Sequence, residues 1–162
     1  MDFAHDLGVD VDEENIDRMY LFFHVQKEGY GIQIGHVIEI VGMQRIVDVP
    51  DVPHYVKGVI NLRGQVIPVI DVRARFKMPE AEYDDRTVII VVEHKGVKTG
   101  FIVDGVSEVL ELSENEISPP PQSAQQRNSM ITGVGHKNEQ ICFLLSLDHM
   151  LTSSTEENSE AV

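Results

Sequence analysis

KGVINLRGQVIPVIDVRARF, residues 57–76, contains two short apolar runs, Val59–Leu62 and Val66–Ile70, separated by Arg63, Gly64 and Gln65. Short runs rich in β-branched residues are typical of strands. Gly64 can adopt the positive φ that a tight connection needs, so the stretch predicts a β-hairpin with Arg63 at its tip. A tip arginine is either a solvated charge or a planar hydrogen-bonding group offered to a partner. The local pattern favours the solvated charge.

The rest of the chain repeats this short strand-like pattern. Apolar runs separated by Gly, Pro, Asn or Asp occur at 19–25, 30–41, 58–62, 66–70, 87–94, 99–112 and 140–147. HKGVKTG, residues 94–100, is typical of a second hairpin connection. Helical signals are weak and short: Asp71 can cap one turn, and Ser146 or Asp148 can start a short closing helix.

Regularly spaced strands in a short chain predict an all-β barrel or sandwich. We favour two small barrels, because the strands fall into halves on either side of the polar segment 78–86. The polar segment between Glu114 and Ile131 carries three consecutive prolines, Pro119 to Pro121, and therefore predicts an extended, exposed loop.

Composition places the chain among globular proteins. It has 162 residues, 42% of them hydrophobic, without an apolar run long enough to span a membrane and without the pattern of a secretory signal. We therefore expect a cytoplasmic protein. Much of the net charge of −14 lies at the ends, so we expect flexible acidic segments at 1–17 and 154–162 around a domain at 18–153. Nucleic acid is an unfavourable partner for such a charge.

The sequence contains little that indicates chemistry. The seven histidines lack metal-ligand spacing. The acidic segment 10–21 begins like a calcium loop but lacks its glycine and final glutamate. The single Cys142 lies in an apolar run and reads as a buried residue. We expect no metal, no cofactor and no enzymatic activity, although Asp71 or Asp104 in a cleft would be the residues to consider for catalysis.

Five segments in order carry a resemblance to a known family. They are YGIQIGHVIEIV (30–41), VPDVPHYVKGVINLRGQVIPVIDVRARF (49–76), TVIIVVEHKGVKTGFIVDGVSEVLEL (87–112), ITGVG (131–135) and FLLSLDHML (143–151). From Tyr20 to about Thr152 the chain resembles the CheW family of chemotaxis adaptor proteins. The resemblance implies two small five-stranded β-barrels packed on a shared hydrophobic core, with the N-terminal strand and a short C-terminal helix completing the second barrel.

The resemblance also implies a function. It implies a non-enzymatic scaffold that couples the cytoplasmic helical hairpin of chemoreceptors to the regulatory domain of a CheA-type histidine kinase. Such a scaffold would reach the membrane only through these partners and would not insert into it. The alternatives are a similar adaptor in an array that controls surface motility or gene expression, and a small-ligand or enzyme domain that uses a cleft between the barrels.

The family's partner-binding positions transfer by match to eight residues of this chain: Val37, Glu39, Gly58, Arg63, Val88, Ile89, Gly100 and Val109. Arg63 would point at a partner or at a groove carboxylate. The aliphatic positions fit the core or the groove equally well, whereas Glu39 must face water or a partner. Gly35 and Ser146 depart from the family pattern, which is relevant to the shape of the groove edge and to the class of receptor.

Overall fold

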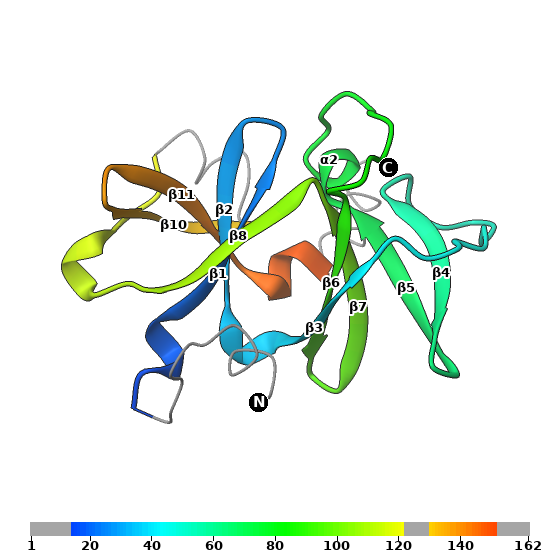
Figure 1. Cartoon of the computed structure of the whole chain (residues 1–162), viewed down its shortest axis with the longest axis horizontal. Coiled ribbons are helices and arrows are strands. Elements are labelled where there is room, and N and C mark those ends of the chain that lie inside the picture. Colours follow the sequence, from blue (N-terminus) through cyan, green and yellow to red (C-terminus); the bar gives the residue numbers. More distant parts are fainter. Residues whose placement is uncertain (1–13, 122–129, 152–162) are drawn as a thin grey trace, which may run out of the picture.

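The computed structural model describes residues 14–121 and 130–151, whose strands form two sheets lying side by side (Figure 1). The terminal sheet has the order β8(Gly105–Glu111), β1(Met19–Val25), β2(Glu28–Gln33), β11(Gln140–Leu145), β10(Ile131–Lys137), β9(Ile117–Ser118). The central sheet has the order β3(Val37–Gly42), β6(Val88–His94), β7(Val97–Val103), β5(Gln65–Asp71), β4(Val56–Leu62). The predicted all-β class is confirmed.

Both predicted hairpins are present. β4 and β5 pair around a turn in which Arg63 has φ 51° and Gly64 has φ 87°. β6 and β7 pair around Lys95 and Gly96, with φ 53° and 80°. Two positive φ values in a two-residue connection match the twist of the flanking strands, which explains the glycine at the second position of each turn.

The helices are short and begin at capping side chains. Asp71 precedes α2(Val72–Arg75) and accepts a hydrogen bond from the Arg73 N–H at 2.9 Å. The predicted closing helix is observed at 147–151, where the Ser146 hydroxyl accepts from the His149 N–H at 3.4 Å. The remaining helical turns are the 3-10 segments η1(Ile16–Arg18), η2(Ile34–His36) and η3(Glu114–Glu116). No helix of the described residues has the length and apolarity needed to cross a membrane.

The sheets divide the chain differently from the division expected at 78–86. β6 and β7 follow that segment but join the central sheet with β3, β4 and β5. β1 and β2 precede it but join β8 to β11. The chain passes from the terminal to the central sheet at η2 and returns at Asp104, so segment 78–86 connects α2 to β6 within the central half.

A single apolar cluster fills the space between the sheets and is called the inter-sheet core. It includes Leu21, Phe23 and Ile32 from the terminal sheet and Ile70, Ile90 and Phe101 from the central sheet. Leu147 and Met150 of the closing helix are buried in the same cluster, and Figure 1 shows this helix between the sheets. The shared core expected from the sequence is confirmed.

Each sheet also curls around a smaller apolar cluster of its own. Ile60, Ile67 and Ile102 belong to the cluster inside the central sheet, and Phe22, Leu112 and Leu144 to that inside the terminal sheet. In the central sheet Val47 forms a bridge with Val59 of the edge strand β4. In the terminal sheet Lys137 of β10 donates to the carbonyl of Glu111 on the edge strand β8 at 2.7 Å. Complete closure of the sheets into barrels stays a prediction.

The remaining sequence predictions concern Cys142, the proline run and the acidic ends. Cys142 is buried, as expected, and burial raises the pKa of its thiol to about 11. Residues 119–121 form no strand, in agreement with the proline run. The acidic ends 1–13 and 152–162 and the loop residues 122–129 lie outside the described residues.

Candidate partner-binding site

The structure brings together two candidate residues that are distant in sequence. The Arg63 guanidinium forms an ion pair and a hydrogen bond with the Glu39 carboxylate. The side chain of Arg63 is 67% exposed and that of Glu39 is 27% exposed. Asn61 Oδ1 accepts from the Gly64 N–H at 2.8 Å, which fixes the turn that carries the arginine. The guanidinium therefore keeps four of its five N–H donors for other partners at one end of the central sheet.

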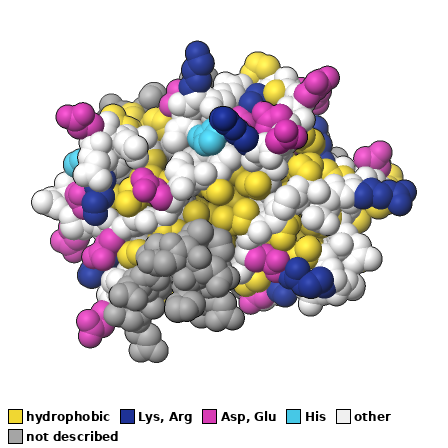
Figure 2. Space-filling view, in the orientation of Figure 1, with side chains coloured by type: hydrophobic (Ala, Val, Ile, Leu, Met, Phe, Trp, Pro, Cys, Tyr) yellow, Lys and Arg dark blue, Asp and Glu magenta, His cyan; other side chains and the backbone are white. Residues whose placement is uncertain are grey.

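Three candidate valines belong to the inter-sheet core or its border. Val37 and Val109 are buried in it, from β3 and β8 respectively. Val88, at the start of β6, is partly buried and packs against it. Ile40 of β3 and Val106 of β8 do the same, and we call Ile40, Val88 and Val106 the inter-sheet patch. Both sheets contribute to this patch. Figure 2 shows apolar side chains gathered in the middle of a face of the molecule.

The other three candidates maintain the shape of the central sheet. Ile89 is fully buried in its interior. A Cβ at Gly100 would lie 2.7 Å from Ile89 Cγ2 and 2.9 Å from Val69 Cγ1. A Cβ at Gly58, where φ is +147°, would lie 2.1 Å from the Val47 carbonyl oxygen. Substitution of Ile89, Gly58 or Gly100 therefore disturbs the packing of the central sheet directly, and affects partner binding only through that change.

Two of the exposed valines lie in strands of the central sheet and were not singled out in the sequence. Val66 of β5 is 71% exposed and Val97 of β7 is 58% exposed. β5 and β7 run parallel with Ile70 opposite Phe101, and both of these residues belong to the inter-sheet core. Since side chains alternate along a strand, Val66 and Val97 lie on that same face, beyond the terminal sheet. We call Val66 and Val97 the outer valines. The sequence did not indicate their exposure, because a β-branched residue in a short apolar run is normally expected to be buried.

The Gln65 and Lys98 side chains lie at the same end of β5 and β7 as the outer valines, on the opposite face of the sheet. Lys98 Nζ donates to Gln65 Oε1 at 3.0 Å, so polar side chains link the two strands beside Val66 and Val97. This end of the central sheet combines apolar area with a charge pair from Arg63 and Glu39. Such a combination suits a protein partner, because apolar contacts provide area and charges set orientation.

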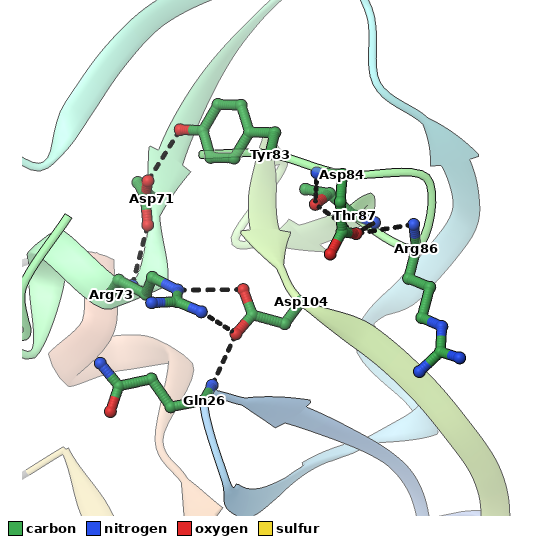
Figure 3. Close-up of polar contacts among 8 residues, drawn as sticks. All are labelled: Gln26, Asp71, Arg73, Tyr83, Asp84, Arg86, Thr87 and Asp104. Carbon is green, nitrogen blue, oxygen red and sulfur yellow. Dashed lines mark hydrogen bonds and ion pairs between the residues drawn. The ribbon is translucent and has the colours of Figure 1, made fainter. Parts of the chain in front are cut away.

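Polar contacts connect the two halves of the molecule at one end of β7. Arg73 Nε and Nη2 donate to the two oxygens of Asp104 at 3.0 and 2.5 Å, and the Gln26 N–H donates to Asp104 at 2.6 Å (Figure 3). Burial on its own raises the pKa of Asp104, but the Arg73 and Gln26 hydrogen bonds and the Arg73 charge hold it below its usual value. The hydrogen bonds to Asp104, together with its charge, raise the pKa of Arg73. Both side chains are therefore charged at neutral pH.

A second polar contact lies at the other end of β7, where β6 and β7 meet. Asp148 accepts from His94 Nε2 at 2.5 Å and from Lys95 Nζ at 3.1 Å. These two hydrogen bonds lower the pKa of the Asp148 carboxyl. A cavity of about 240 Å³ beside them is lined by residues of both sheets, including Gln33, His36 and Thr132. No group of three or more metal-ligating side chains was found among residues 14–121 and 130–151.

Comparison with known proteins identifies one family. The CheW-like domain model matches residues 19–155. The chain is 36% identical to the chemotaxis protein CheW of Klebsiella aerogenes over 141 residues, which cover 86% of this chain and 85% of the relative. It is 37% identical to CheW of Rhizobium meliloti over 144 residues, covering 88% and 93%. The crystal structure of the scaffolding protein TtCheW from Thermoanaerobacter tengcongensis superposes with a TM-score of 0.78 at 33% identity, covering 84% of this chain and 93% of that chain.

Proposed function

The chain belongs to the CheW family, and from this premise we propose that it is a chemotaxis scaffold which couples chemoreceptors to a CheA-type histidine kinase. It catalyses no reaction of its own. The observation that carries the proposal is the family match over residues 19–155, which spans both sheets and the core between them. The relatives at 36 and 37% identity are both chemotaxis proteins, and the similar crystal structure is of a scaffolding protein.

The receptor's cytoplasmic helical hairpin would dock along the molecule, on the outer valines and the Glu39–Arg63 pair at one end of β7 and on the inter-sheet patch toward the other end. A helix binds such a surface through apolar side chains on one face, while a few charges fix its register. Arg63 is suited to this role because its guanidinium retains free donors while bound to Glu39. Val37 and Val109 support the patch from beneath, and Ile89, Gly58 and Gly100 keep the central sheet in shape.

The kinase regulatory domain is the second partner. Because the resemblance gives that domain the same two-barrel fold, the kinase and this chain would meet through related sheet surfaces. Binding both partners at once makes the chain a physical link between receptor and kinase. We place it in the cytoplasm, at membrane-associated receptor arrays that it reaches through these partners.

Kinase autophosphorylation tests this proposal directly. The cognate CheA-type kinase and a receptor cytoplasmic fragment are assayed with and without this protein. We expect autophosphorylation to rise above the level of either pair only when all three proteins are present. Absence of binding to both partners at about tens of micromolar, where transient signalling contacts still register, would show that the chain has another role.

A further inference from the structure

Asp104 occupies the point at which the chain leaves the central sheet. It follows Val103, the last residue of β7, and precedes Gly105, the first residue of β8 in the terminal sheet. Its N–H donates to the carbonyl of His24 on β1 at 3.1 Å. Its side chain accepts from the Gln26 N–H in the β1–β2 turn at 2.6 Å. The backbone and side chain of Asp104 are therefore both bound to the terminal sheet.

Arg73 is held from the other side by elements of the central half. Asp71, the last residue of β5, is buried and accepts from the Arg73 N–H at 2.9 Å. The hydroxyl of Tyr83 donates to the second oxygen of Asp71 at 2.7 Å, which fixes that carboxylate (Figure 3). The guanidinium then reaches Asp104 with two parallel hydrogen bonds. A two-point contact of this kind defines an orientation as well as a distance.

The Arg73–Asp104 contact is the more shielded of the two polar links beside β7. Its side chains are 19% and 24% exposed, whereas Asp148 at the opposite end is 51% exposed. The seven residues of β7 separate the two ends by roughly 20 Å. Shielded charge pairs are less weakened by salt than exposed ones. The Arg73–Asp104 contact is therefore the better candidate for one that fixes the orientation of the two sheets relative to each other.

We infer that Arg73 and Asp104 are a positioning pair, which sets the orientation of the central sheet relative to the terminal sheet and thereby completes the receptor-binding surface. The pair does not touch the partner. It acts through the inter-sheet patch, where Ile40 and Val88 belong to one sheet and Val106 to the other. The inference on orientation stands on the contacts alone, and its consequence for binding rests on the proposed function.

The test measures the distance between the two sheets by pulsed electron–electron double resonance between two spin labels. Spin labels are attached at Asp48, beside the central sheet, and at Gln140 of β11, both exposed, in a Cys142→Ala background. We compare the parent with Arg73→Gln, with Asp104→Asn and with the conservative Arg73→Lys. Glu111→Gln is the control, because its ion pair with Arg18 lies within the terminal half.

We expect a broadened or displaced distance distribution for Arg73→Gln and for Asp104→Asn, and the parent distribution for Glu111→Gln. Arg73→Lys retains the charge but not the two-point contact, so we expect a distribution between these limits. Affinity for the receptor fragment should fall on the order of tenfold in Arg73→Gln, a typical size for coupling between separate sites. If Arg73→Gln melts without a cooperative transition, Asp104→Asn provides the measurement.

Three results bear on the positioning role and on the proposed function. A distance distribution of Arg73→Gln and Asp104→Asn that superposes on the parent would overturn the positioning role, whatever the binding data. A displaced distribution in a protein whose parent form neither binds the receptor fragment nor stimulates the kinase would instead contradict the proposed function. Loss of binding with unchanged distances would show that Arg73 or Asp104 contacts the partner directly, which also overturns the inference.

Discussion

Glu39 and Arg63 form an ion pair between two opposite edges of the central sheet. Glu39 belongs to β3, Arg63 follows β4, and β3 and β4 are the outermost strands in the sheet order. Their contact requires the sheet to curl until its edges approach, as the Val47–Val59 bridge also indicates. The tip arginine is therefore held in a defined position while most of its surface stays exposed, which suits recognition of a partner.

Replacing Arg63 separates binding from folding. We expect Arg63→Ala to lower the free energy of unfolding by less than about 1 kcal/mol, because exposed ion pairs contribute little. The same variant should lose binding to the receptor fragment or to the kinase in calorimetric titration. Glu39→Gln is the companion variant, since it removes the ion pair but leaves Arg63 available. A fall in melting temperature of about ten degrees in Arg63→Ala would instead show a structural role.

Replacing Gly100 should lower the stability of the fold, whereas replacing Arg63 should lower partner binding. The added Cβ of Gly100→Ala meets Ile89 and Val69 at distances that force one of them to move. We expect a loss of roughly 1–3 kcal/mol in the free energy of unfolding, the usual effect of overpacking. Urea denaturation measures it. Gly42→Ala is the matched control on β3, because a Cβ there meets nothing within 4 Å. Equal stabilities of the two variants would contradict this account.

Local features were predictable from sequence because neighbouring residues determine them. The glycine at the second position of each hairpin turn, the Asp71 cap and the Ser146 cap are contacts within a few residues, and all were observed. The assignment of strands to sheets was not predictable in this way. It depends on two crossovers, at η2 and at Asp104, and on the parallel pairing of β5 with β7, for which local alternation carries no signal.

The candidate site was also only partly predictable, because the sequence does not show which strand residues are exposed. Val37 and Val66 are the same residue type in short strands, but Val37 is buried in the inter-sheet core and Val66 is exposed. The difference arises because the terminal sheet covers only part of the face on which both strands pack. The family resemblance supplied Glu39 and Arg63 as separate candidates, and the structure adds their ion pair. Only the three-dimensional arrangement distinguishes a surface residue from Ile89 or Gly100, which lie inside.

Acid should weaken the Arg73–Asp104 link. The pKa of Asp104 is lowered in the folded protein from an ordinary value of 3.8. Its contribution to stability is therefore complete above about pH 5 and is lost as pH falls through the folded pKa. We expect the free energy of unfolding of Asp104→Asn to depend less on pH below 5 than that of the parent. Urea titrations from pH 6 to about pH 2 measure this, and parallel curves for the two proteins would count against it.

Cys142 should be unreactive in the folded protein. Burial raises the pKa of its thiol to about 11, and the thiolate is the reactive form. At pH 8 about one thiol in a thousand is ionised, and the residue is also inaccessible. We expect an aromatic disulfide reagent to label it slowly in buffer and rapidly in urea. Equally fast labelling in both conditions would mean that the interior of the terminal sheet opens readily.

Val66 provides the sharpest test of the exposed surface. Val66→Thr keeps the shape and the strand preference of the side chain but replaces a methyl group with a hydroxyl. Because Val66 is 71% exposed, the free energy of unfolding should change by less than about 0.5 kcal/mol. Affinity for the receptor fragment should nevertheless fall, since the apolar area it offers to a partner becomes polar.

Ile141→Thr is the matched control for Val66→Thr, because Ile141 of β11 is 65% exposed but lies in the terminal sheet, away from the outer valines. If receptor binding depends on the central-sheet surface, only the Val66 variant should weaken it. Equal losses in both variants would point to a general effect of surface hydrophobicity, and a loss confined to Ile141→Thr would move the receptor site to the terminal sheet. The comparison thus assigns the receptor to one sheet without requiring a structure of the complex.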